Sequence, residues 1–473
     1  MSESSVMILV ADGVRPDTLQ AAIDAGELPA LAALRSEGEG HVLVSSFPSV
    51  SIVGYAPMLV GRHPARAGLP GLRWFDRRRA LSRWLGHSRS YVGLALRRID
   101  RDLLTDAPTA FELLPHGSLG AMSGITRGLA PRDRLDAGLR FATRASWHHL
   151  RADVRGSIAL DRHVGERLVD RVRRERPRFV FAAFPACDKA AHAAGHASPL
   201  VREALRTVDD VAAKLRRDAE RDGRWREMHL WVVSDHGHSP VDGHDDLAGL
   251  LHSWGFAIRA HPWTTPRPAD VAVMVSGNAM AYLYVELARR ERPWWPALSG
   301  RWGELVEALL ARPSVDLLGL PHAPHRIEVR TRERGHAVVE CVKGRYSHRP
   351  IDGDPLGAGE FEGACAAEVL ERTAEGAYPD APVQLAALCG AGRCGDIVVS
   401  AALGWDLRER YEPLRHVSTH GSLHRDHMLV PLLVNRPATS QPGRLVDLFP
   451  SALNSLGAPL PPGIDGRPFL PAV

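Results

Sequence analysis

The sequence is poor in cysteine and has no long apolar run. Its 473 residues include five scattered cysteines, an odd number that argues against a framework of disulfides. No uninterrupted apolar stretch reaches the length of a membrane span, and the first residues lack the basic region of a signal peptide. These absences predict a cytoplasmic protein that does not enter a membrane.

Lysine is also scarce, with only three residues, so the basic side chains are almost all arginine. The formal net charge is only +4, and a pI near 8.9 gives no argument for nucleic acid as a partner. Hydrophobic residues make up 45% and charged residues 24% of the chain, as in an ordinary globular protein. Length alone permits two or three domains, although large α/β enzymes often form one.

Strand-like apolar runs alternate with helical patterns along most of the chain. Such alternation is typical of βαβ units, in which helices cover both faces of a mostly parallel sheet. We expect strands near residues 6–11, 117–125, 179–184, 229–234 and 428–434, and helices near residues 17–36, 158–175, 199–221 and 445–456. The predicted fold is therefore α/β, a three-layer α/β/α sandwich with a largely parallel central sheet.

Residues 258–400 do not follow this alternation. They contain several strand-like pieces separated by turns rich in proline and glycine. We interpret this segment as a cap-like insertion, and residues 1–257 together with 401–473 as the core that carries the site. Residues 65–105 also differ from the rest, because they are rich in arginine and tryptophan and have weak periodicity.

Four separate segments carry acidic residues or histidines next to an apolar run. These residues are Asp12 after 6–11, Asp188 and His192 after 179–184, Asp235 and His236 after 229–234, and His420 before 428–434. Polar residues at the ends of buried strands lie at the carboxyl edge of a sheet, where α/β proteins bind ligands. Asp12 alone would more often be a turn residue or a helix cap. The set of three aspartates and three histidines, however, would suffice for two metal sites.

Residues 42–68 contain a hydroxyl-rich loop between an apolar run and a helix-like segment. We expect Ser51 to lie at the start of that helix, where free N–H groups and the helix dipole favour a phosphate. A serine hydroxyl is a weak nucleophile at its ordinary pKa, so it needs a base or a metal. Ser51 is the predicted nucleophile, and Ser45, Ser46 and Ser49 on the same loop are the alternatives.

Several short motifs occur in a fixed order from Asp12 nearly to the C-terminus. They are Asp12-Gly13-Val14-Arg15-Pro16-Asp17, Phe47-Pro48-Ser49-Val50-Ser51, Gly61 with Pro64 and Gly68, Asp188 with His192, Ser234-Asp235-His236-Gly237, Thr419-His420-Gly421, and closing segments at 446–450 and 463–468. Each motif is weak alone. In this order they resemble the type I phosphodiesterase/nucleotide pyrophosphatase family of the alkaline phosphatase superfamily.

The resemblance implies an alkaline-phosphatase-like fold and hydrolysis of phosphodiesters or nucleotide pyrophosphates. It implies two divalent metal ions, Zn²⁺ in the first place and Mn²⁺ as an alternative. The implied ligands are Asp188, His192 and His420 for one ion, and Asp12, Asp235, His236 and the oxygen of Ser51 for the other. Two such metals about 4 Å apart can serve an in-line displacement from both sides. Ser51 would attack phosphorus, form a covalent intermediate and be released by hydrolysis.

Some positions depart from the family pattern. Gly54 stands where an asparagine often helps to bind a phosphate oxygen, and Tyr55 stands where histidine is common. Pro57 suits the first turn of a helix better than its interior, so the helix should start later than in relatives. These departures leave open a phosphomonoesterase or phosphotransferase, and a catalytically inactive binding protein. The expected partner is a small phosphate ester or nucleotide, without nucleic acid or membrane.

Two further sets of residues have an uncertain role in the sequence. Histidines and one acid near the motifs are interpreted as surface residues or as residues that orient a ligand: His196, His238, His244, His416, His424, Asp426 and His427. Arginines and tryptophans in the segment 65–105 could bind a phosphate or stack a base, or could form a solvated surface with aromatic anchors: Arg73, Trp74, Arg77, Arg78, Arg79 and Trp84.

Overall fold

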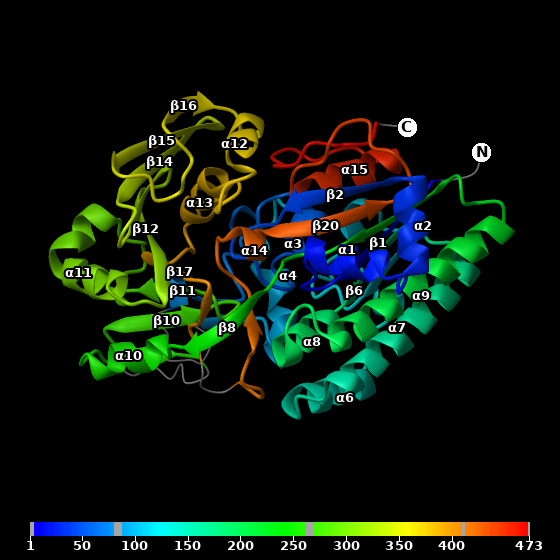
Figure 1. Ribbon diagram of the computed structural model, residues 1–473, viewed down its shortest axis with the longest axis horizontal. Helices are drawn as coiled ribbons and strands as arrows, with labels where there is room; N and C mark the ends of the chain where they lie inside the picture. The colour runs from blue at the N-terminus through cyan, green and yellow to red at the C-terminus, as the bar shows by residue number, and fades with distance from the viewer. Residues whose placement is uncertain (1–3, 80–87, 262–267, 409–411, 472–473) are drawn as a thin grey trace.

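The computed structural model describes residues 4–79, 88–261, 268–408 and 412–471. Most of its strands belong to two large sheets, one in each half of the molecule (Figure 1). The first sheet has six strands in the order β2-β20-β7-β1-β6-β5. Their bounds are β1 Ser5–Ala11, β2 Glu39–Val44, β5 Ser118–Ala121, β6 Phe179–Phe184, β7 Met228–Val233 and β20 Leu429–Val434.

Most neighbouring strands of this sheet are parallel. β1 pairs in parallel with both β6 and β7, and β5 pairs in parallel with β6. β20 runs antiparallel to β7, and β2 runs antiparallel to β20. Two reversals restore the direction, so β2 points the same way as β1. The prediction of a largely parallel central sheet is confirmed.

Helices cover both faces of the six-stranded sheet. Because successive strand residues point to opposite faces, Met7 and Leu9 pack with one set of helices and Ile8 and Val10 pack with the other. The first set is α1 Pro16–Asp24, α2 Pro29–Glu37, α6 Leu139–Leu150, α7 Val154–Glu175, α8 Ala186–Ala194 and α9 Pro199–Arg221. The second set is α3 Ala56–Val60, α5 Ala110–Leu113 and α15 Leu448–Ser455. The predicted α/β/α sandwich is confirmed.

The single helix expected over residues 17–36 is two helices instead. α1 ends at Asp24, and α2 begins at Pro29. Proline fits the first turn of a helix, where its missing N–H is not needed, but it disrupts a helix that continues through it. The long helix expected over 199–221 is α9, whose start is capped by the Ser198 side chain.

The second sheet has nine strands and lies within the segment from Ile258 to Ala401. Its order is β16-β15-β14-β13-β12-β17-β11-β10-β9. The bounds are β9 Ile258–Ala260, β10 Val271–Val275, β11 Met280–Tyr284, β12 Val315–Ala323, β13 Arg326–Thr331, β14 His336–Val342, β15 Arg345–Asp352, β16 Phe361–Ala364 and β17 Ile397–Ala401. Its helices are α11 Trp295–Leu310, α12 Ala366–Thr373 and α13 Ala381–Cys389. These elements make up the segment interpreted above as a cap.

Short elements complete the chain. They are β3 Arg73–Phe75 with β4 Ser88–Ser90, β8 Ser239–His244 with β18 Gly404–Asp406 and β19 Ser418–Thr419, and the helices α4 Ile99–Asp102, α10 Leu247–Ser253 and α14 Arg425–Met428. Val10 of β1 and Tyr282 of β11 belong to one hydrophobic cluster, so the two sheets share a continuous core. Within the described ranges, no helix combines the length and apolar character required to cross a bilayer.

Candidate active site

The acidic residues of the predicted site follow three neighbouring parallel strands. Asp12 follows β1, Asp188 lies in the first turn of α8 after β6, and Asp235 follows β7. β6, β1 and β7 are adjacent in the sheet, so their carboxyl ends lie side by side. His420 precedes β20, which is antiparallel to β7, so the start of β20 lies at the same edge. Distant parts of the sequence therefore meet there.

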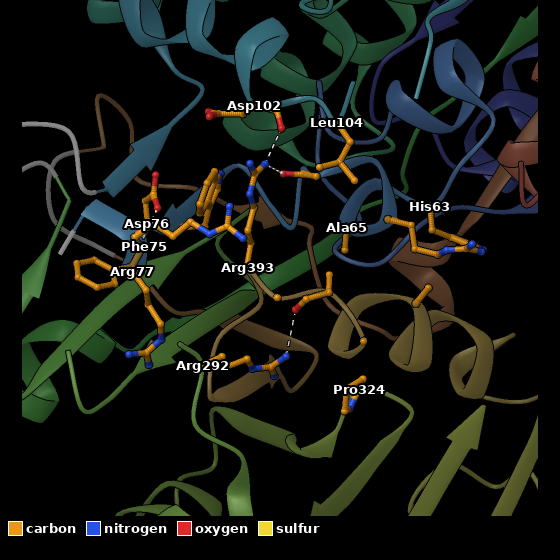
Figure 2. A pocket seen from close by; sticks show the side chains of 18 of the residues that line it. His63, Ala65, Phe75, Asp76, Arg77, Asp102, Leu104, Arg292, Pro324 and Arg393 are labelled. Atoms are coloured by element: carbon orange, nitrogen blue, oxygen red, sulfur yellow. Dashed lines mark hydrogen bonds between the residues drawn. The ribbon is translucent and has the colours of Figure 1, made fainter. Parts of the chain in front are cut away.

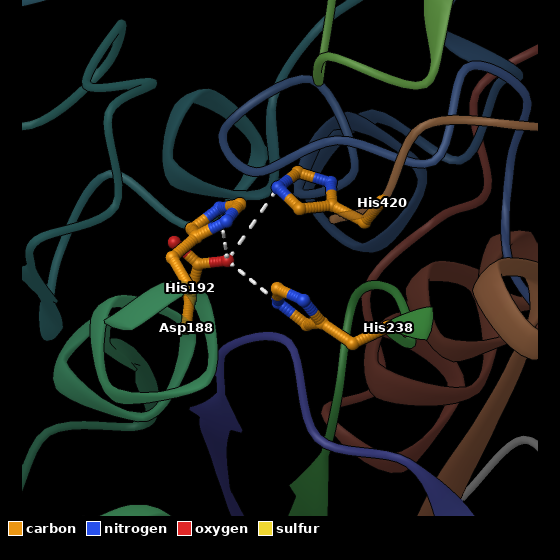
Figure 3. A group of neighbouring side chains, drawn as sticks. All are labelled: Asp188, His192, His238 and His420. Carbon is orange, nitrogen blue, oxygen red and sulfur yellow. Dashed lines mark hydrogen bonds and ion pairs between the residues drawn. The ribbon is translucent and has the colours of Figure 1, made fainter. Parts of the chain in front are cut away.

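Three imidazoles surround one carboxylate oxygen (Figure 3). Oδ1 of Asp188 lies 3.3 Å from Nε2 of His192, 2.9 Å from Nε2 of His238 and 3.5 Å from Nε2 of His420. His192 is one helical turn beyond Asp188 on α8, as their spacing predicts. We call these four residues the Asp188 group. They lie close enough together to hold a metal ion.

Two of these imidazoles are oriented by backbone carbonyl groups. Nδ1 of His192 donates to the carbonyl of Ser418 over 2.8 Å, and Nδ1 of His420 donates to the carbonyl of Ser49 over 2.8 Å. A carbonyl can only accept, so the proton of each neutral ring is on Nδ1. Each Nε2 therefore carries a lone pair, which is the form in which histidine binds a metal.

His238 is oriented in the same way by a side chain. Its Nδ1 lies 3.1 Å from the hydroxyl of Ser418, and that hydroxyl donates its proton to the carbonyl of Ser239. The hydroxyl must therefore accept from Nδ1, which leaves a lone pair on Nε2 of His238. Lone pairs of three imidazoles thus face the oxygen of Asp188, and a cation among them would turn this repulsion into attraction.

Burial keeps these imidazoles neutral. It lowers the pKa of His238 to about 3, and it also lowers the pKa of His192 and of His420. An ionised carboxylate among neutral imidazoles is a donor set that suits zinc.

A second buried group contains Asp12, Asp235 and His236, each at most 1% exposed. Nε2 of His236 lies 3.3 Å from Oδ1 of Asp12 and 3.6 Å from Oδ2 of Asp235. Oδ1 of Asp235 accepts from the N–H of Gly13, whereas its Oδ2 finds no hydrogen-bond donor among the described residues. A buried carboxylate oxygen without a donor is costly, so this atom fits a cation.

The charges of this second group point to the same conclusion. Burial and the neighbouring Asp12 raise the pKa of Asp235 well above its ordinary value. Burial works to lower the pKa of His236, but Asp235 and Asp12 outweigh it and raise that pKa to about 10. The two carboxylates therefore draw a positive charge into the site. A divalent cation can take the place of the proton on His236.

Ser51 lies against this second group. Its Oγ is 2.8 Å from Oδ1 of Asp12 and 3.0 Å from Nε2 of His236. The alternatives Ser45 and Ser49 donate instead to backbone carbonyl groups.

The second group also touches the first. The rings of His236 and His420 stack with their centroids 3.7 Å apart. All seven residues predicted for the site are thus gathered in one place: Asp12, Ser51, Asp188, His192, Asp235, His236 and His420.

The backbone at Ser51 differs from the expected helix start. α3 begins at Ala56 with Pro57 in its first turn, so a turn separates Ser51 from the helix. The N–H of Val53 donates to the carbonyl of Ser51 over 2.8 Å, and Ile52 has a φ of 70°, as in a γ-turn. Positive φ is unfavourable for a β-branched residue. The predicted help from a helix dipole is therefore wrong, and Asp12 and His236 are the groups that contact the hydroxyl.

Two residues join the site without having been predicted in these positions. His238 was expected only among residues that orient a ligand. Tyr55 donates a hydrogen bond from its hydroxyl to Oδ2 of Asp12, and burial raises the pKa of that hydroxyl, which therefore stays protonated. Gly54, the departure noted beside it, leaves room for Asp235, because a Cβ there would lie 3.2 Å from the Asp235 Cβ.

Other polar residues named from the sequence surround the site. The ring of His416 stacks on His192 at 4.0 Å and lies 3.1 Å from Asp406. Asp426 pairs with Arg15 over 3.1 Å. The stacking of His416 on His192 suits a residue that orients a ligand, as the sequence suggests, whereas Arg15, the partner of Asp426, is not one of the predicted ligands.

A cavity of about 210 Å³ opens onto the Asp188 group and onto Ser51, and Ser51, Asp188, His192 and His420 are among its lining residues. A larger cavity of about 1030 Å³ lies beside the arginine-rich segment (Figure 2). Trp74 is buried there against the guanidinium groups of Arg89 and Arg393. It is therefore an anchor in the core rather than a surface for a base. Trp84 lies outside the described residues.

An α/β/α sandwich with two acid–imidazole groups at the carboxyl edge of its sheet defines the architecture of the alkaline phosphatase superfamily. Residues 6–297 match the sequence model of the family "Type I phosphodiesterase / nucleotide pyrophosphatase". The chain belongs to this metal-dependent family. It is a phosphoric ester hydrolase of the phosphodiesterase/nucleotide pyrophosphatase type, as predicted. No curated protein matches the chain by sequence.

Solved structures support the fold. Phosphonoacetate hydrolase from Sinorhizobium meliloti 1021, in complex with phosphonoformate, is 18% identical with a TM-score of 0.57, and 96% of each chain is covered. Murine ectonucleotide pyrophosphatase/phosphodiesterase 5 is 14% identical with a TM-score of 0.57, and 98% of this chain and 97% of that chain are covered. An inactive form of the murine protein was solved with AMP. At these identities the likeness establishes the fold alone.

Proposed function

We propose that this protein hydrolyses phosphodiesters or nucleotide pyrophosphates, with Ser51 as a nucleophile that becomes covalently phosphorylated. The observation that carries the proposal is the position of the Ser51 hydroxyl. It lies within hydrogen-bond distance of both Asp12 and His236, at the junction of two groups that each fit a cation. A nucleophile, a proton acceptor and two metal sites in one pocket are the parts that such a reaction requires.

Two divalent cations, Zn²⁺ in the first place and Mn²⁺ as an alternative, would complete the site. The Asp188 group would hold one, and Asp12, Asp235, His236 and Oγ of Ser51 would hold the other. Such cations, when bound, polarise phosphoryl oxygens and lower the pKa of hydroxyl groups and water. His238 adds a fourth donor to the Asp188 group.

Three residues have distinct roles in the proposed reaction: Ser51 attacks phosphorus, Asp12 accepts its proton, and Tyr55 orients Asp12. Asp12 is positioned to accept the proton of Ser51, while Tyr55 donates to its other oxygen and fixes the carboxylate. The Ser51 oxygen then forms a bond to phosphorus, and the bond from phosphorus to the leaving oxygen breaks. The leaving oxygen takes a proton from solvent. Attack of water on phosphorus breaks the bond to Ser51 and restores its hydroxyl.

The test begins with metal content and two chromogenic substrates. Protein loaded with zinc should hydrolyse bis(p-nitrophenyl) phosphate faster than p-nitrophenyl phosphate, and a chelator should abolish the activity. Faster turnover of the monoester would replace the proposal with a phosphomonoesterase. No turnover of either substrate, or of natural phosphate esters, by metal-replete protein would favour an inactive binding protein.

Variants of the loop identify the nucleophile. Ser51→Ala should lower kcat more than about a thousandfold while retaining most of the metal. Asp235→Asn should lose metal and activity together. Ser49→Ala is the matched control, because Ser49 lies on the same loop but donates to the Ser422 carbonyl. If Ser51→Ala keeps its activity, the nucleophile is another residue.

A further inference from the structure

The cavity in front of Ser51 contains two basic side chains that the proposed chemistry does not use. Arg73 of β3 and Lys189 of α8 both line it. Lys189 is one of only three lysines in the chain and directly follows Asp188. Neither residue forms an ion pair with a carboxylate in the described structure.

Arg73 is buried with little to satisfy its guanidinium group. It is 7% exposed, and the one hydrogen bond that its guanidinium group makes among the described residues goes from Nη1 to the carbonyl of Val275 over 3.2 Å. Its Nε is buried without a partner among the described residues. Burial lowers the pKa of Arg73 to about 10, which still leaves the group charged at neutral pH. A buried charge without an anion is costly, which suggests that a ligand supplies the anion.

Lys189 is held in the wall of the same cavity. Its Nζ donates to the hydroxyl of Ser157 over 3.3 Å, which orients the ammonium group but does not neutralise it. An ammonium group has three N–H donors, so two of them have no partner in the described part of the chain and can bind a ligand.

Three acidic residues line the cavity: Asp188, which belongs to the Asp188 group and would hold a cation there, and Glu412 and Asp153, which have other partners. Glu412 accepts an ion pair from Arg408 over 3.0 Å. Asp153 lies 2.9 Å from Nδ1 of His148 and caps the start of α7. None of the three forms an ion pair with Arg73 or Lys189 among the described residues, so these two basic groups remain available to an anionic ligand.

The cavity does not suit a nucleobase. None of its described lining residues is Phe, Tyr or Trp, the side chains on which a base stacks most readily. Its volume of about 210 Å³ is below the range of about 300–1,000 Å³ that is usual for sites of larger ligands. A small substituent with a negative charge fits both its size and its electrostatics.

We propose that Arg73 and Lys189 form a subsite for a second anionic group, a carboxylate or a phosphate, on a small phosphate compound whose phosphoryl group lies at Ser51. This inference rests on the proposed function, because it takes the pocket at Ser51 as the place of the phosphoryl group. Guanidinium binds carboxylate or phosphate through paired hydrogen bonds, and ammonium adds a compact charge.

Binding of matched ligands tests the subsite. 2-Phosphoglycolate and ethyl phosphate have the same chain length and differ in a terminal carboxylate against a methyl group. Calorimetry with zinc-loaded protein in the Ser51→Ala background, which does not consume the ligands, should give about tenfold or tighter binding of phosphoglycolate. 2-Aminoethyl phosphate, whose terminus is positive, should bind no better than ethyl phosphate. Ethylene glycol bisphosphate distinguishes a phosphate from a carboxylate as the preferred second anion.

Variants connect the preference to the two residues. Arg73→Gln and Lys189→Gln should each reduce the preference for phosphoglycolate over ethyl phosphate about tenfold, with little change for ethyl phosphate. Lys189 is half-buried, so its variant should fold even if the Arg73 variant does not. Arg78→Gln, an equal charge change in the larger cavity, should leave the preference unchanged.

Three results would overturn the subsite: equal binding of phosphoglycolate and ethyl phosphate, a preference that survives in both variants, or tighter binding of AMP than of phosphoglycolate. Absence of turnover in the chromogenic assay would instead remove the proposed function, and the binding comparison would still report on the subsite.

Discussion

Hydrogen bonds from the Nδ1 atom of each imidazole fix the position of its Nε2 atom, the metal-binding atom that faces Asp188. Because carbonyl groups and the Ser418 hydroxyl take the Nδ1 protons, the Nε2 atoms converge on one oxygen. His238 is packed tightly into this arrangement, since a Cβ added to Gly13 would lie 2.9 Å from its Nε2. Gly13 has a φ of 71°, a conformation that glycine adopts readily, and it lets His238 approach the end of β1.

Removal of His238 should weaken the metal site. His238→Ala takes one donor from the Asp188 group and leaves the carboxylate with two imidazoles. We expect zinc affinity at this site to fall about 10- to 100-fold, as measured by competition with a chromogenic chelator. His252→Ala, which removes an exposed histidine on α10, should bind zinc like the wild type. Unchanged affinity in His238→Ala would make His238 a packing residue only.

Sequence patterns predicted those site residues that reach the site because of their position next to a strand of the sheet. Asp12 and Asp235 directly follow buried strands, and the sheet edge gathers such residues whatever the loops do. His238 and Tyr55 could not be predicted in the same way, because their contacts depend on how the chain turns after β7 and after Ser51. Arg73 was named only as a possible phosphate ligand, since nothing in its own segment shows that β3 lies beside the cavity.

At the scale of elements, the direction in which a strand runs decides which residues reach the site. The antiparallel β20 brings His420 to the edge where the parallel strands end. Helix boundaries were harder to predict, as the separation of α1 from α2 at Pro29 shows. The short helix α3 begins five residues after Ser51 and ends at Gly61, whose φ is 70°. Local sequence does not reveal that Gly61 packs directly against α15.

Substitution of Gly61 should destabilise the protein through this packing. A Cβ at Gly61 would lie 2.4 Å from the ring of Phe449, and the left-handed backbone itself disfavours alanine. We expect Gly61→Ala to lower the free energy of unfolding by about 2–4 kcal/mol, measured from urea midpoints.

Gly26→Ala separates the two causes, because Gly26 has a φ of 73° but nothing within 4 Å of its Cβ position. It should cost only about 1 kcal/mol. Equal losses in the two variants would mean that contact with Phe449 contributes nothing.

At the scale of the whole molecule, the two sheets are joined through buried contacts. Arg77 near β3 pairs with Asp396 before β17, and Arg444 before α15 pairs with Asp380 at the start of α13. Breaking such a buried pair leaves an uncompensated charge. The first pair therefore holds the segment after β3 against the nine-stranded sheet, and the second holds the segment before α15 against α13. No pattern in the sequence indicated these pairs, because their partners lie 64 or more positions apart.

His63 lies near this junction and should make stability depend on pH. It is 5% exposed, and its Nδ1 has no hydrogen-bond partner among the described residues. Burial, together with Arg444 and Arg66, lowers the pKa of His63 to about 3 from its ordinary value of 6.5. The unfolded chain therefore binds a proton at His63 between about pH 6.5 and pH 3, and the folded chain does not. The contribution of His63 to stability is complete above this window and is lost as the pH falls through it.

The size of this effect follows from the same two values. At pH 5 the unfolded state gains about 2 kcal/mol from protonation of His63 that it does not have at pH 7. His63→Gln cannot be protonated, so its free energy of unfolding should fall by about 2 kcal/mol less than that of the wild type between pH 7 and pH 5. Urea unfolding of both proteins after chelation measures the difference, since acid release of metal then contributes to neither. Other buried histidines titrate equally in the two proteins, so parallel pH curves would show that His63 is protonated in the folded state.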